Sequence, residues 1–542
     1  MTGAQYIVDS LIRRGITDAF GIPGGVILRL IYEMDNRREI ITPHLSYHEQ
    51  SAGFAACGYA QSCGKLGVAY ATRGPGFTNL LTPIADAYYD SLPVLFITAH
   101  ASPCPPKNMR AMNDQEMDAC DMVKNITKMT LRADDAETFA DSFEDLCDTA
   151  LDGRKGPVLL DVSTNILTRE IPVTYTKKEK TTPNAKIDVR FITHAIQNAK
   201  RPVFLAGDGI NQSNARELFQ ILVEKAQIPV ISSRFSHDIQ AVCNNLYYGY
   251  IGSHGIRSAN FILSKSDLIV SIGNRMHFPL ESESYKPILE HANIIRCDID
   301  EGEFERKIPN TTNILIDLRK LISSLNTYDQ YGNHSEWLSI CDTLRGKLRD
   351  TDLNIATDRI SNILKDIPKE YSICCDVGNN EFWVSRACVL HDIKNRAFYS
   401  KSFGAMGCGL GKAIGIYYGT KKPVYCFVGD QGFQMNIQEL QTIVQNDLPI
   451  TIVLLNNQAS GMIRDREIHL YEGRCVHTTK DSGYTTPNFE KIVEGYGLES
   501  FRFMDVRIDE DLELYPQLPK GNPIQKMTYL LEEKLYDRLN EM

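Results

Sequence analysis

Two short polar motifs carry the chemistry that this sequence suggests most directly. The first, Gly429-Asp430-Gln431-Gly432, follows an apolar run over 423–428, and the second, Asn456-Asn457, follows another over 449–455. Both runs have the character of buried parallel strands, whose carboxyl ends form the edge of an α/β sheet where ligands bind. A carboxylate, an amide oxygen and a backbone carbonyl are hard oxygen ligands suited to Mg²⁺. The pair therefore predicts a metal that holds a diphosphate.

Each motif alone has a simpler interpretation, because Gly-Asp-Gln-Gly is a common turn and Asn-Asn a common loop. Their combination, each after a predicted strand, favours the ligand site. A further acid, Glu49, lies in His48-Glu49-Gln50 ahead of a run of small residues over 51–60 that predicts a helix open to close packing. Acidic residues also favour helix N-termini through the helix dipole alone.

Length and composition exclude several classes of protein. The 542 residues predict several domains, and a hydrophobic content of 43% with 23% charged residues is typical of a globular chain. Net charge is −10, which argues against general nucleic-acid or anionic-membrane binding. No window approaches the roughly 20 apolar residues of a membrane helix, and residues 1–15 predict an amphipathic helix in place of a signal peptide. The 14 cysteines are scattered, so we expect reduced thiols and a cytoplasmic location.

The chain alternates strand-like and helix-like segments in three blocks, divided by polar stretches at 176–184 and 326–335. Such alternation predicts an α/β fold of three doubly wound domains with mostly parallel sheets. The strongest strand candidates are 19–20, 67–72, 93–98 and 157–161 in the first block, 202–206, 229–232, 268–272 and 294–298 in the second, and 372–376, 423–428 and 449–455 in the third.

Several motifs in order make the chain resemble the large catalytic subunit of acetolactate synthase, a thiamin diphosphate (ThDP)-dependent enzyme. The resemblance covers nearly the whole length, and its most specific parts are FGIPGG at 20–25, HEQ at 48–50, RGPG at 73–76, GPVLLD at 156–161, GAMG at 404–407 and the run 429–462. It implies a pyrimidine-binding ThDP domain over 1–172, a central domain of the FAD- or nucleotide-binding type over 185–325, and a diphosphate- and Mg²⁺-binding ThDP domain over 350–535.

The resemblance also implies a role for individual residues. Glu49 would be the acid that activates the cofactor, while Gln115 and Gly25, with its neighbour Gly24, would line the reacting carbon. Met406 would bend the cofactor, although methionine also simply fills gaps in cores. Glycine pairs are common in tight turns as well. The implied Mg²⁺ ligands are Asp430, Asn457 and the carbonyl of Ala459, and further cofactor contacts are Gly404, Ala405, Gly429, Gln431, Gly432 and Asn379.

The activity implied is decarboxylation of a 2-keto acid, with pyruvate as the expected donor, and transfer of the acyl anion equivalent to an acceptor carbonyl. The family also implies a homodimer or homotetramer, in which the first block of one subunit faces the third block of its partner across a shared active site. One alternative is a simple ThDP-dependent decarboxylase or lyase, which would need an acid/base histidine such as His44, His48 or His100. Another is a regulatory or binding protein without turnover.

On the acceptor side the chain departs from the family. Pro279 replaces an arginine that would clamp the carboxylate of a second keto acid, and Arg466 replaces an acceptor-selecting tryptophan. Asp114 and Thr164 replace a phenylalanine and a lysine. We therefore expect an acceptor other than a 2-keto acid, because proline cannot supply a bidentate guanidinium.

Arg464 and Arg466 could meet a phosphate, a sulfonate or a nucleotide-sugar. Alternatively, these two arginines form a solvated helix face with Asp465 and Glu467.

A flavin site is a further expectation from the family. Residues at FAD positions are His254, Gly255, Arg275, Asp298, Asp300 and Asp317. However, Gly207-Asp208-Gly209 stands where the family has three glycines. This leaves open whether FAD is bound, bound weakly or lost.

Overall fold

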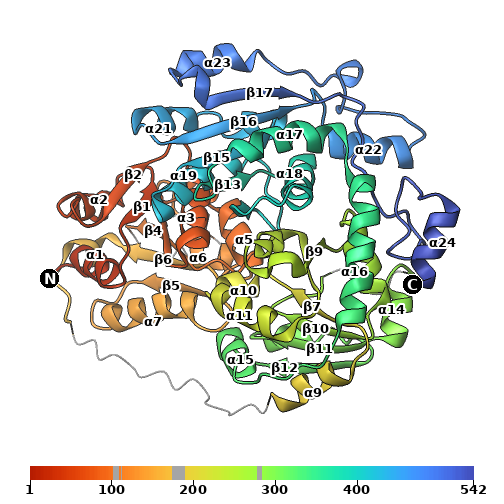
Figure 1. Ribbon diagram of the computed structural model, residues 1–542. Coiled ribbons are helices and arrows are strands. Elements are labelled where there is room, and N and C mark those ends of the chain that lie inside the picture. Colours follow the sequence, from red (N-terminus) through yellow and green to blue (C-terminus); the bar gives the residue numbers. More distant parts are fainter. Residues whose placement is uncertain (102–108, 111–112, 174–188, 278–282) are drawn as a thin grey trace. The chain divides into compact units, whose positions relative to one another are not determined.

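The computed structural model describes residues 1–101, 109–110, 113–173, 189–277 and 283–542 (Figure 1). It contains three β-sheets and divides into two compact units. The first unit comprises Met1–Thr182, Glu370–Asn380 and Ala397–Glu510, and the second comprises Pro183–Lys369, Glu381–Arg396 and Asp511–Met542. The polar stretch 176–184 and Pro279 lie outside the described residues, as do 102–108 and 111–112.

The first sheet, in the first unit, has the strand order β2-β1-β3-β4-β6-β5 with parallel pairing throughout. Its strands are β1 (Asp18–Gly21), β2 (Thr42–Leu45), β3 (Gly67–Tyr70), β4 (Val94–His100), β5 (Met129–Ala133) and β6 (Val158–Ser163). The helices of this region are α1 (Gly3–Arg13), α2 (Leu28–Asp35), α3 (Glu49–Cys63), α4 (Pro75–Asn79), α5 (Leu81–Tyr89), α6 (Ala119–Val123), α7 (Phe139–Leu151) and α8 (Thr164–Thr168).

The third sheet, also in the first unit, has the order β14-β13-β15-β16-β17. Its strands are β13 (Ser372–Cys375), β14 (Arg396–Tyr399), β15 (Val424–Gly429), β16 (Ile450–Asn456) and β17 (Phe503–Arg507). The helices of this region are α19 (Gly409–Thr420), α20 (Asp430–Met435), α21 (Glu439–Gln445), α22 (Gly461–Leu470) and α23 (Phe489–Tyr496), while α18 (Asn379–Leu390) begins in this unit and belongs from Glu381 onward to the second. In both sheets the chain reverses its direction of winding beside an inner strand, at β1/β3 and at β13/β15, and ligands of open α/β sheets bind at such switch points.

The second unit contains the sheet β12-β11-β10-β7-β8-β9, again with parallel pairs. Its strands are β7 (Pro202–Ala206), β8 (Val230–Ser232), β9 (Tyr247–Tyr250), β10 (Leu268–Ile272), β11 (Asn293–Asp298) and β12 (Thr311–Leu315). Its helices are α9 (Arg190–Asn198), α10 (Gly209–Gln212), α11 (Arg216–Ala226), α12 (Gln240–Cys243), α13 (Arg257–Lys265), α14 (Lys286–His291), α15 (Leu318–Leu325), α16 (Ser335–Leu348), α17 (Ile355–Asp366) and α24 (Glu533–Glu541). Taken from its far end, this order is that of dinucleotide-binding folds.

The three parallel sheets confirm the predicted fold class, and each predicted strand has a counterpart in the structure. Within the described residues, no helix combines the length and the apolar character needed to cross a membrane. The described cysteines are free thiols. The domain boundaries stay predictions.

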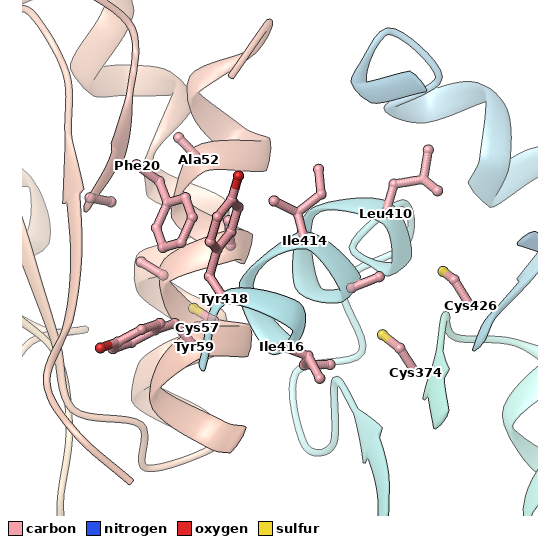
Figure 2. Packing of buried hydrophobic residues seen from close by; sticks show 14 of the residues in the cluster. Phe20, Ala52, Cys57, Tyr59, Cys374, Leu410, Ile414, Ile416, Tyr418 and Cys426 are labelled. Atoms are coloured by element: carbon pink, nitrogen blue, oxygen red, sulfur yellow. The ribbon is translucent and has the colours of Figure 1, made fainter. Parts of the chain in front are cut away.

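Helices α3 and α19 join the first and third sheets into one core (Figure 2). Their backbones touch, because a Cβ on Gly58 would lie 2.3 Å from the carbonyl oxygen of Lys412, and one on Gly415 only 1.8 Å from that of Ala55. Aromatic and aliphatic side chains, including Phe20 and Tyr418, fill the space beside this contact. The close approach predicted from the small residues of the helix at 51–60 is thus confirmed.

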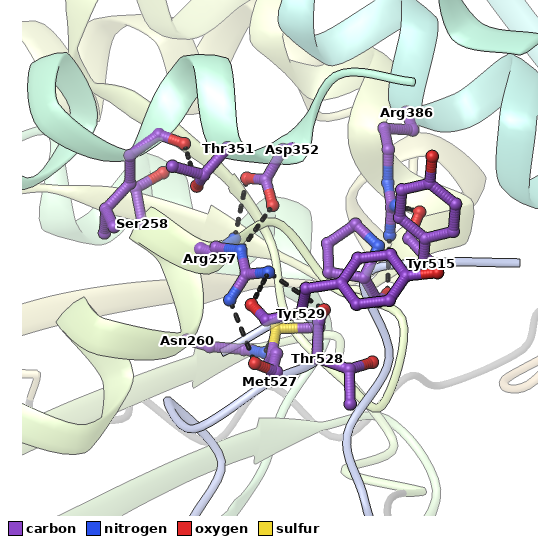
Figure 3. A network of polar contacts seen from close by, with 12 residues as sticks. Arg257, Ser258, Asn260, Thr351, Asp352, Arg386, Tyr515, Met527, Thr528 and Tyr529 are labelled. Atoms are coloured by element: carbon purple, nitrogen blue, oxygen red, sulfur yellow. Dashed lines mark hydrogen bonds and ion pairs between the residues drawn. The ribbon is translucent and has the colours of Figure 1, made fainter. Parts of the chain in front are cut away.

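In the second unit a buried arginine anchors the C-terminal segment (Figure 3). Arg257 donates to the carbonyl oxygens of Met527, Thr528 and Tyr529 at 3.1, 2.9 and 2.7 Å, and it lies 3.4 Å from Asp352. Since a buried guanidinium without partners is very costly, these contacts hold the segment in place.

Candidate active site

Asp430 lies at the switch point of the third sheet, directly after β15. Its carboxyl is buried, and Oδ1 accepts hydrogen bonds from the backbone of Gln431 (2.8 Å) and from the hydroxyl of Tyr484 (2.9 Å). Oδ2 has no hydrogen-bond partner among the described residues. Burial raises the pKa of Asp430 to about 6. A buried acceptor without a partner is rare in folded proteins, so this oxygen faces a place suited to a ligand.

The two sequence motifs meet at this point. The backbone of Gln458, which follows Asn457, lies near enough to the Asp430 carboxyl to lower its pKa, against the larger effect of burial. Asn457 is buried beside Asn379, because a Cβ on Gly461 would lie 2.6 Å from Nδ2 of Asn457 and 2.9 Å from Nδ2 of Asn379. Asn379 is buried as well, and neither its side-chain oxygen nor its nitrogen has a partner among the described residues.

These residues fit a Mg²⁺ ion and a diphosphate. A carboxylate oxygen and a buried amide side chain, both lacking hydrogen bonds, lie at one sheet edge, and Mg²⁺ prefers such oxygen ligands together with phosphate and water. Ala459 is buried in the loop between β16 and α22. Gly432 is required by packing, since a Cβ there would lie 2.9 Å from Oδ2 of Asp376. A Cβ on Gly429 would lie 2.7 Å from Asn380.

Glu49 is the first residue of α3 and is half-buried. Its Oε2 accepts a hydrogen bond from Nδ2 of Asn79 (2.9 Å), and a Cβ on Gly76 would lie 3.1 Å from its Oε1. The preceding residue, His48, caps the helix by accepting from the backbone of Gln50 at 3.1 Å. The glutamate therefore projects from a capped helix end beside the RGPG loop.

Asn436 connects the start of α3 to the loop that carries Met406. It donates to Oε1 of Gln50 (3.1 Å) and to the carbonyl of Gly407 (2.9 Å), and it accepts from the hydroxyl of Ser51 (2.8 Å). Two of these hydrogen-bond partners are direct neighbours of site residues in the chain, because Gln50 follows Glu49 and Gly407 follows Met406. Sequence reasoning did not identify Asn436, since no spacing rule links it to either motif.

Glu439 was also missed. It is buried at the start of α21, and its Oε1 accepts hydrogen bonds from the backbone of Tyr47 (3.0 Å) and of His48 (3.1 Å). Burial raises its pKa to about 7. The acid thus holds the turn that leads into Glu49. Its sequence signal is a lone acid at the start of an otherwise uncharged helix.

Met406 is 38% exposed, so it does not serve as a core residue in the described chain. It lies between Gly404 (φ 67°) and Gly407 (φ 85°), which adopt left-handed backbone conformations. Ala405 beside it is buried. A side chain held outward by two such residues is available to support a ligand.

The two glycines Gly24 and Gly25 differ in the space around their Cα atoms. A Cβ on Gly24 would lie 2.4 Å from Cβ of Thr72, so this glycine is required by packing. A Cβ on Gly25 would meet nothing within 4 Å. Gln115 is exposed with φ 59°, and its backbone closely approaches Gly74. Gly25 and Gln115 therefore both have room for a substrate.

The two arginines on α22 differ from each other. Arg464 is buried and pairs with Asp465, whereas Arg466 is exposed. The predicted pairing of Arg464 with Asp465 is therefore confirmed, whereas the predicted solvated position is wrong for this arginine. Glu467 accepts from the backbone of Val476 (3.0 Å) and from the hydroxyl of Thr478. At the other replaced positions, Asp114 is exposed and Thr164 begins α8.

The three candidate histidines all have structural contacts. His44 lies 2.8 Å from Asp18, and His100 lies 2.8 Å from Asp161 and 2.7 Å from Asp134. Burial lowers the pKa of His44 although Asp18 opposes it, whereas the carboxylates raise that of His100 against the effect of burial. His48 caps α3, as described above.

The predicted flavin residues lie in the second unit. Arg275 pairs with Glu303 at 3.0 Å, and Asp300 caps the short helix Glu301–Phe304 that contains this glutamate. The ring of His254 lies 4.7 Å from that of Phe382. The structure thus brings Arg275 and Asp300 together, while His254 has a separate set of contacts.

Asp208 lies at the switch point of the central sheet, where a dinucleotide fold places a diphosphate. It precedes α10, and its carboxylate accepts from the side chains of Asn211 (3.1 Å) and Gln212 (2.8 Å). The adjacent Gly207 is required by packing, since a Cβ there would lie 2.0 Å from the carbonyl oxygen of Gly273. The fold therefore suits a nucleotide, but a carboxylate at this position repels a diphosphate.

Comparison with known proteins agrees with this geometry. Residues 1–122 match the N-terminal TPP-binding domain of thiamine pyrophosphate enzymes, 189–325 match their central domain, and 376–521 match their C-terminal TPP-binding domain.

Curated relatives match along most of their length. The acetolactate synthase large subunit of Lactococcus lactis is 30% identical, over 95% of this chain and 90% of its own. The isozyme 1 large subunit of Escherichia coli K12 is 31% identical over 96% of both chains, and the large subunit of Porphyra purpurea is 30% identical over 92% and 87%. The chain therefore belongs to the family of thiamine pyrophosphate-dependent transferases that includes the acetolactate synthase large subunits.

Proposed function

We propose that this chain is a ThDP-dependent carboligase that decarboxylates a 2-keto acid, with pyruvate as the expected donor, and transfers the acyl unit to an acceptor carbonyl. The observation that carries the proposal is the buried Oδ2 of Asp430 and the buried amide of Asn379, which have no hydrogen-bond partner among the described residues, at the sheet edge where the two motifs meet. Glu49, at the start of a helix packed on the same unit, supplies the acid that such an enzyme needs.

Four residues of the chain would bind the metal and the diphosphate. Asp430, Asn457 and the carbonyl of Ala459 would hold Mg²⁺, and Asn379 would contact the diphosphate. Bound ThDP supplies an electron sink for the loss of carbon dioxide.

The remaining site residues would act on the cofactor's rings and the substrate. Glu49 would share a proton with the aminopyrimidine ring, and Asn79 holds its carboxylate in place at 2.9 Å. Met406 would support the bent cofactor, while Gly25 and Gln115 leave room for the substrate.

For the acceptor, we propose a carbonyl compound other than a 2-keto acid. The absence of an arginine at Pro279 removes the expected clamp for a second keto acid's carboxylate. Arg466, exposed on α22, is available to a phosphate, sulfonate or nucleotide-sugar group, whereas the Arg464 guanidinium is engaged by Asp465.

The partners of the histidines argue against the simple decarboxylase. Such an enzyme needs a histidine free to donate a proton beside the reacting carbon. His44 and His100 are instead held by carboxylates, and His48 uses Nδ1 to cap α3.

Product analysis tests the proposal. The protein would be incubated with pyruvate, Mg²⁺, ThDP and a panel of acceptors that includes aldehydes, phosphorylated ketones and 2-keto acids, and the products identified by mass spectrometry. We expect a ketol formed from a non-keto-acid acceptor. Acetolactate as the main product would contradict the acceptor assignment, acetaldehyde alone would favour the decarboxylase, and no consumption of any 2-keto acid would contradict the proposal as a whole.

We also propose a homo-oligomer. Tyr88, Tyr89, Phe403 and Met406 are large apolar side chains exposed in the first unit, and the rings of Tyr89 and Phe403 stack at 5.5 Å. A group of exposed apolar side chains of this kind is typical of an interaction surface.

Whether the site is shared between subunits can be tested by mixing two inactive variants, Glu49→Gln and Asp430→Asn. Recovery of activity in the mixture supports a shared site. Failure to recover it indicates a site formed within one chain, as the contacts of Asn436 with Gln50 and Gly407 would allow.

A further inference from the structure

A lysine is fully buried in α19, facing two aspartates of α5 and of the turn that follows it. Nζ of Lys412 lies 2.8 Å from Oδ2 of Asp86 and 3.9 Å from Oδ2 of Asp90, and all three side chains are 0% exposed. Burial lowers the pKa of Lys412, but the two carboxylates outweigh it and raise the pKa overall. Burial raises the pKa of Asp90 to about 6, and Asp86 adds to this effect. We call these three residues the Lys412 cluster.

The aspartates of the Lys412 cluster hold the chain segment that precedes Met406. Asp90 accepts hydrogen bonds from the backbone of Lys401 (2.8 Å) and of Ser402 (2.7 Å). Asp86 accepts a short hydrogen bond from the hydroxyl of Ser400.

The same Ser400 hydroxyl accepts from the backbone of Ala405 at 3.0 Å. Both ends of the segment 400–405 are thus tied to α5 and the turn after it through buried carboxylates.

On the far side of Met406, the backbone is also fixed. The amide of Gly407 donates to Oδ1 of Asp376 (3.1 Å), and its carbonyl accepts from Asn436 (2.9 Å). Met406 therefore stands between two buried anchoring groups while its own side chain stays exposed. A residue that supports a bent ligand needs a backbone held in this way, because small displacements weaken positioning strongly.

Stability alone does not account for the cluster. A buried ion pair often contributes no more to stability than well-packed apolar residues of the same size. What apolar residues could not supply is the set of acceptors for the backbone N–H groups of Lys401 and Ser402. The arrangement therefore specifies a conformation of the segment 400–405.

We propose that the Lys412 cluster is a positioning device for cofactor binding, which fixes segment 400–405 and through it the place of Met406. This inference rests on the proposed function, because it takes Met406 to be the residue that supports ThDP. It assigns Lys412, Asp86 and Asp90 as positioning residues that act through the backbone and do not touch the cofactor themselves.

The test compares ThDP binding with folding stability. Asp90→Asn and Lys412→Met would be titrated with ThDP in saturating Mg²⁺ by isothermal calorimetry, and Tm would be measured without cofactor. We expect the Kd for ThDP to rise by about tenfold or more in both variants, as for other residues that hold ligating groups in place. Near-ultraviolet circular dichroism of the bound cofactor should change as well, because Met406 no longer holds the same conformation.

The matched control is Glu144→Gln. Glu144 is a buried acid paired with Arg13 at 2.8 Å and with Arg14 in the same unit, and the described contacts do not connect it to segment 400–405. This variant should lower Tm while leaving the Kd for ThDP unchanged. A purely structural role for the Lys412 cluster predicts the same behaviour for Asp90→Asn and Lys412→Met, and that result would overturn the inference.

Ser400→Ala covers the case in which a charge variant does not fold. It keeps all three charges and removes only the hydrogen bonds to Asp86 and Ala405, so an unchanged Kd for ThDP in this variant would also overturn the inference. If the wild-type chain fails to bind ThDP, both the inference and the proposed function are wrong. If the wild type binds ThDP and Glu49→Gln lacks turnover, but the cluster variants bind normally, only the inference is wrong.

Discussion

Tyr484 donates a hydrogen bond of 2.9 Å to Oδ1 of Asp430 and leaves Oδ2 without a partner among the described residues. The tyrosine therefore orients the carboxylate so that one oxygen is reserved for a ligand. Residues that hold a metal ligand in this way affect metal affinity by about 10- to 100-fold. We predict that Tyr484→Phe raises the Mg²⁺ concentration needed for half-maximal ThDP binding by about tenfold. This concentration is measured by titrating Mg²⁺ at fixed ThDP.

Tyr471→Phe is the control for this prediction, because Tyr471 is an exposed residue of the segment that precedes Tyr484. It should behave as the wild type. Equal Mg²⁺ dependence in the wild type and Tyr484→Phe would show that the hydrogen bond has no part in metal binding.

The acid at the start of α3 is predicted to be essential for turnover. Glu49→Gln keeps an oxygen to accept from Asn79 but cannot share a proton, so ThDP should still bind while kcat falls by about 100-fold or more. Consumption of pyruvate and calorimetric titration with ThDP give the two readouts. Glu39→Gln, at an exposed position, serves as the control. Unchanged kcat in Glu49→Gln would exclude the assigned role.

The strands that sequence patterns did not predict are edge strands of their sheets throughout the described chain: β2, β5, β9, β12, β14 and β17. A central strand of a parallel sheet is buried on both faces, so it forms a continuous apolar run that is easily recognised. Edge strands are often partly exposed, as in β12, where four of the five residues are exposed or half-buried. The inner strands and the fold class could therefore be predicted, whereas the width of each sheet could not.

The candidate site shows a similar division. Glu49, Met406, Asp430 and Asn457 belong to local motifs whose spacing can be recognised in a single sequence. Their supporting residues, such as Asn436 and the Lys412 cluster, act across long stretches of chain. These supporting residues meet the site only because α3, α5 and the turn after α5 pack against the region of the third sheet. Spacing along the sequence therefore cannot reveal them.

Glu439 should make stability depend on pH. Because burial raises its pKa from 4.5 to about 7, the folded chain retains a proton that the unfolded chain has released between these values. The free energy of unfolding therefore falls as pH rises through this window, and the loss is complete above the folded pKa. Glu439→Gln cannot ionise, so we expect its stability relative to the wild type to increase by up to about 3 kcal/mol from about pH 5 to pH 8.

Urea denaturation at the two pH values measures this difference. Glu494→Gln, on the exposed side of α23, should show no change with pH relative to the wild type. A constant difference between Glu439→Gln and the wild type would mean that Glu439 ionises normally in the folded chain.

Asp208 is predicted to limit flavin binding. Its carboxylate lies where the central domain would place a diphosphate, and juxtaposed like charges oppose binding. Asp208→Gly should therefore tighten FAD binding by about tenfold, followed by equilibrium dialysis and visible absorbance. Asp208→Asn separates the causes, because it removes the charge but keeps the size of the side chain. If neither variant binds FAD more tightly than the wild type, the charge of Asp208 is not what limits the site.

The stacked pair Tyr89 and Phe403 is predicted to lie in a homo-oligomer interface. Both rings are more than two-fifths exposed and nearly parallel, with an interplanar angle of 7°. Aromatic residues at the centre of an interface carry much of its binding energy, so Phe403→Ser should raise the dissociation constant of the oligomer by about tenfold or more. Analytical ultracentrifugation over a dilution series measures this change. Tyr32→Ser, at another exposed aromatic position of the same unit, should leave the oligomer intact. Phe403 directly follows Ser402, whose backbone N–H donates to Asp90. If the interface supports the segment that leads to Met406, Phe403→Ser should therefore weaken ThDP binding as well as association. An unchanged sedimentation profile for Phe403→Ser would place the interface elsewhere.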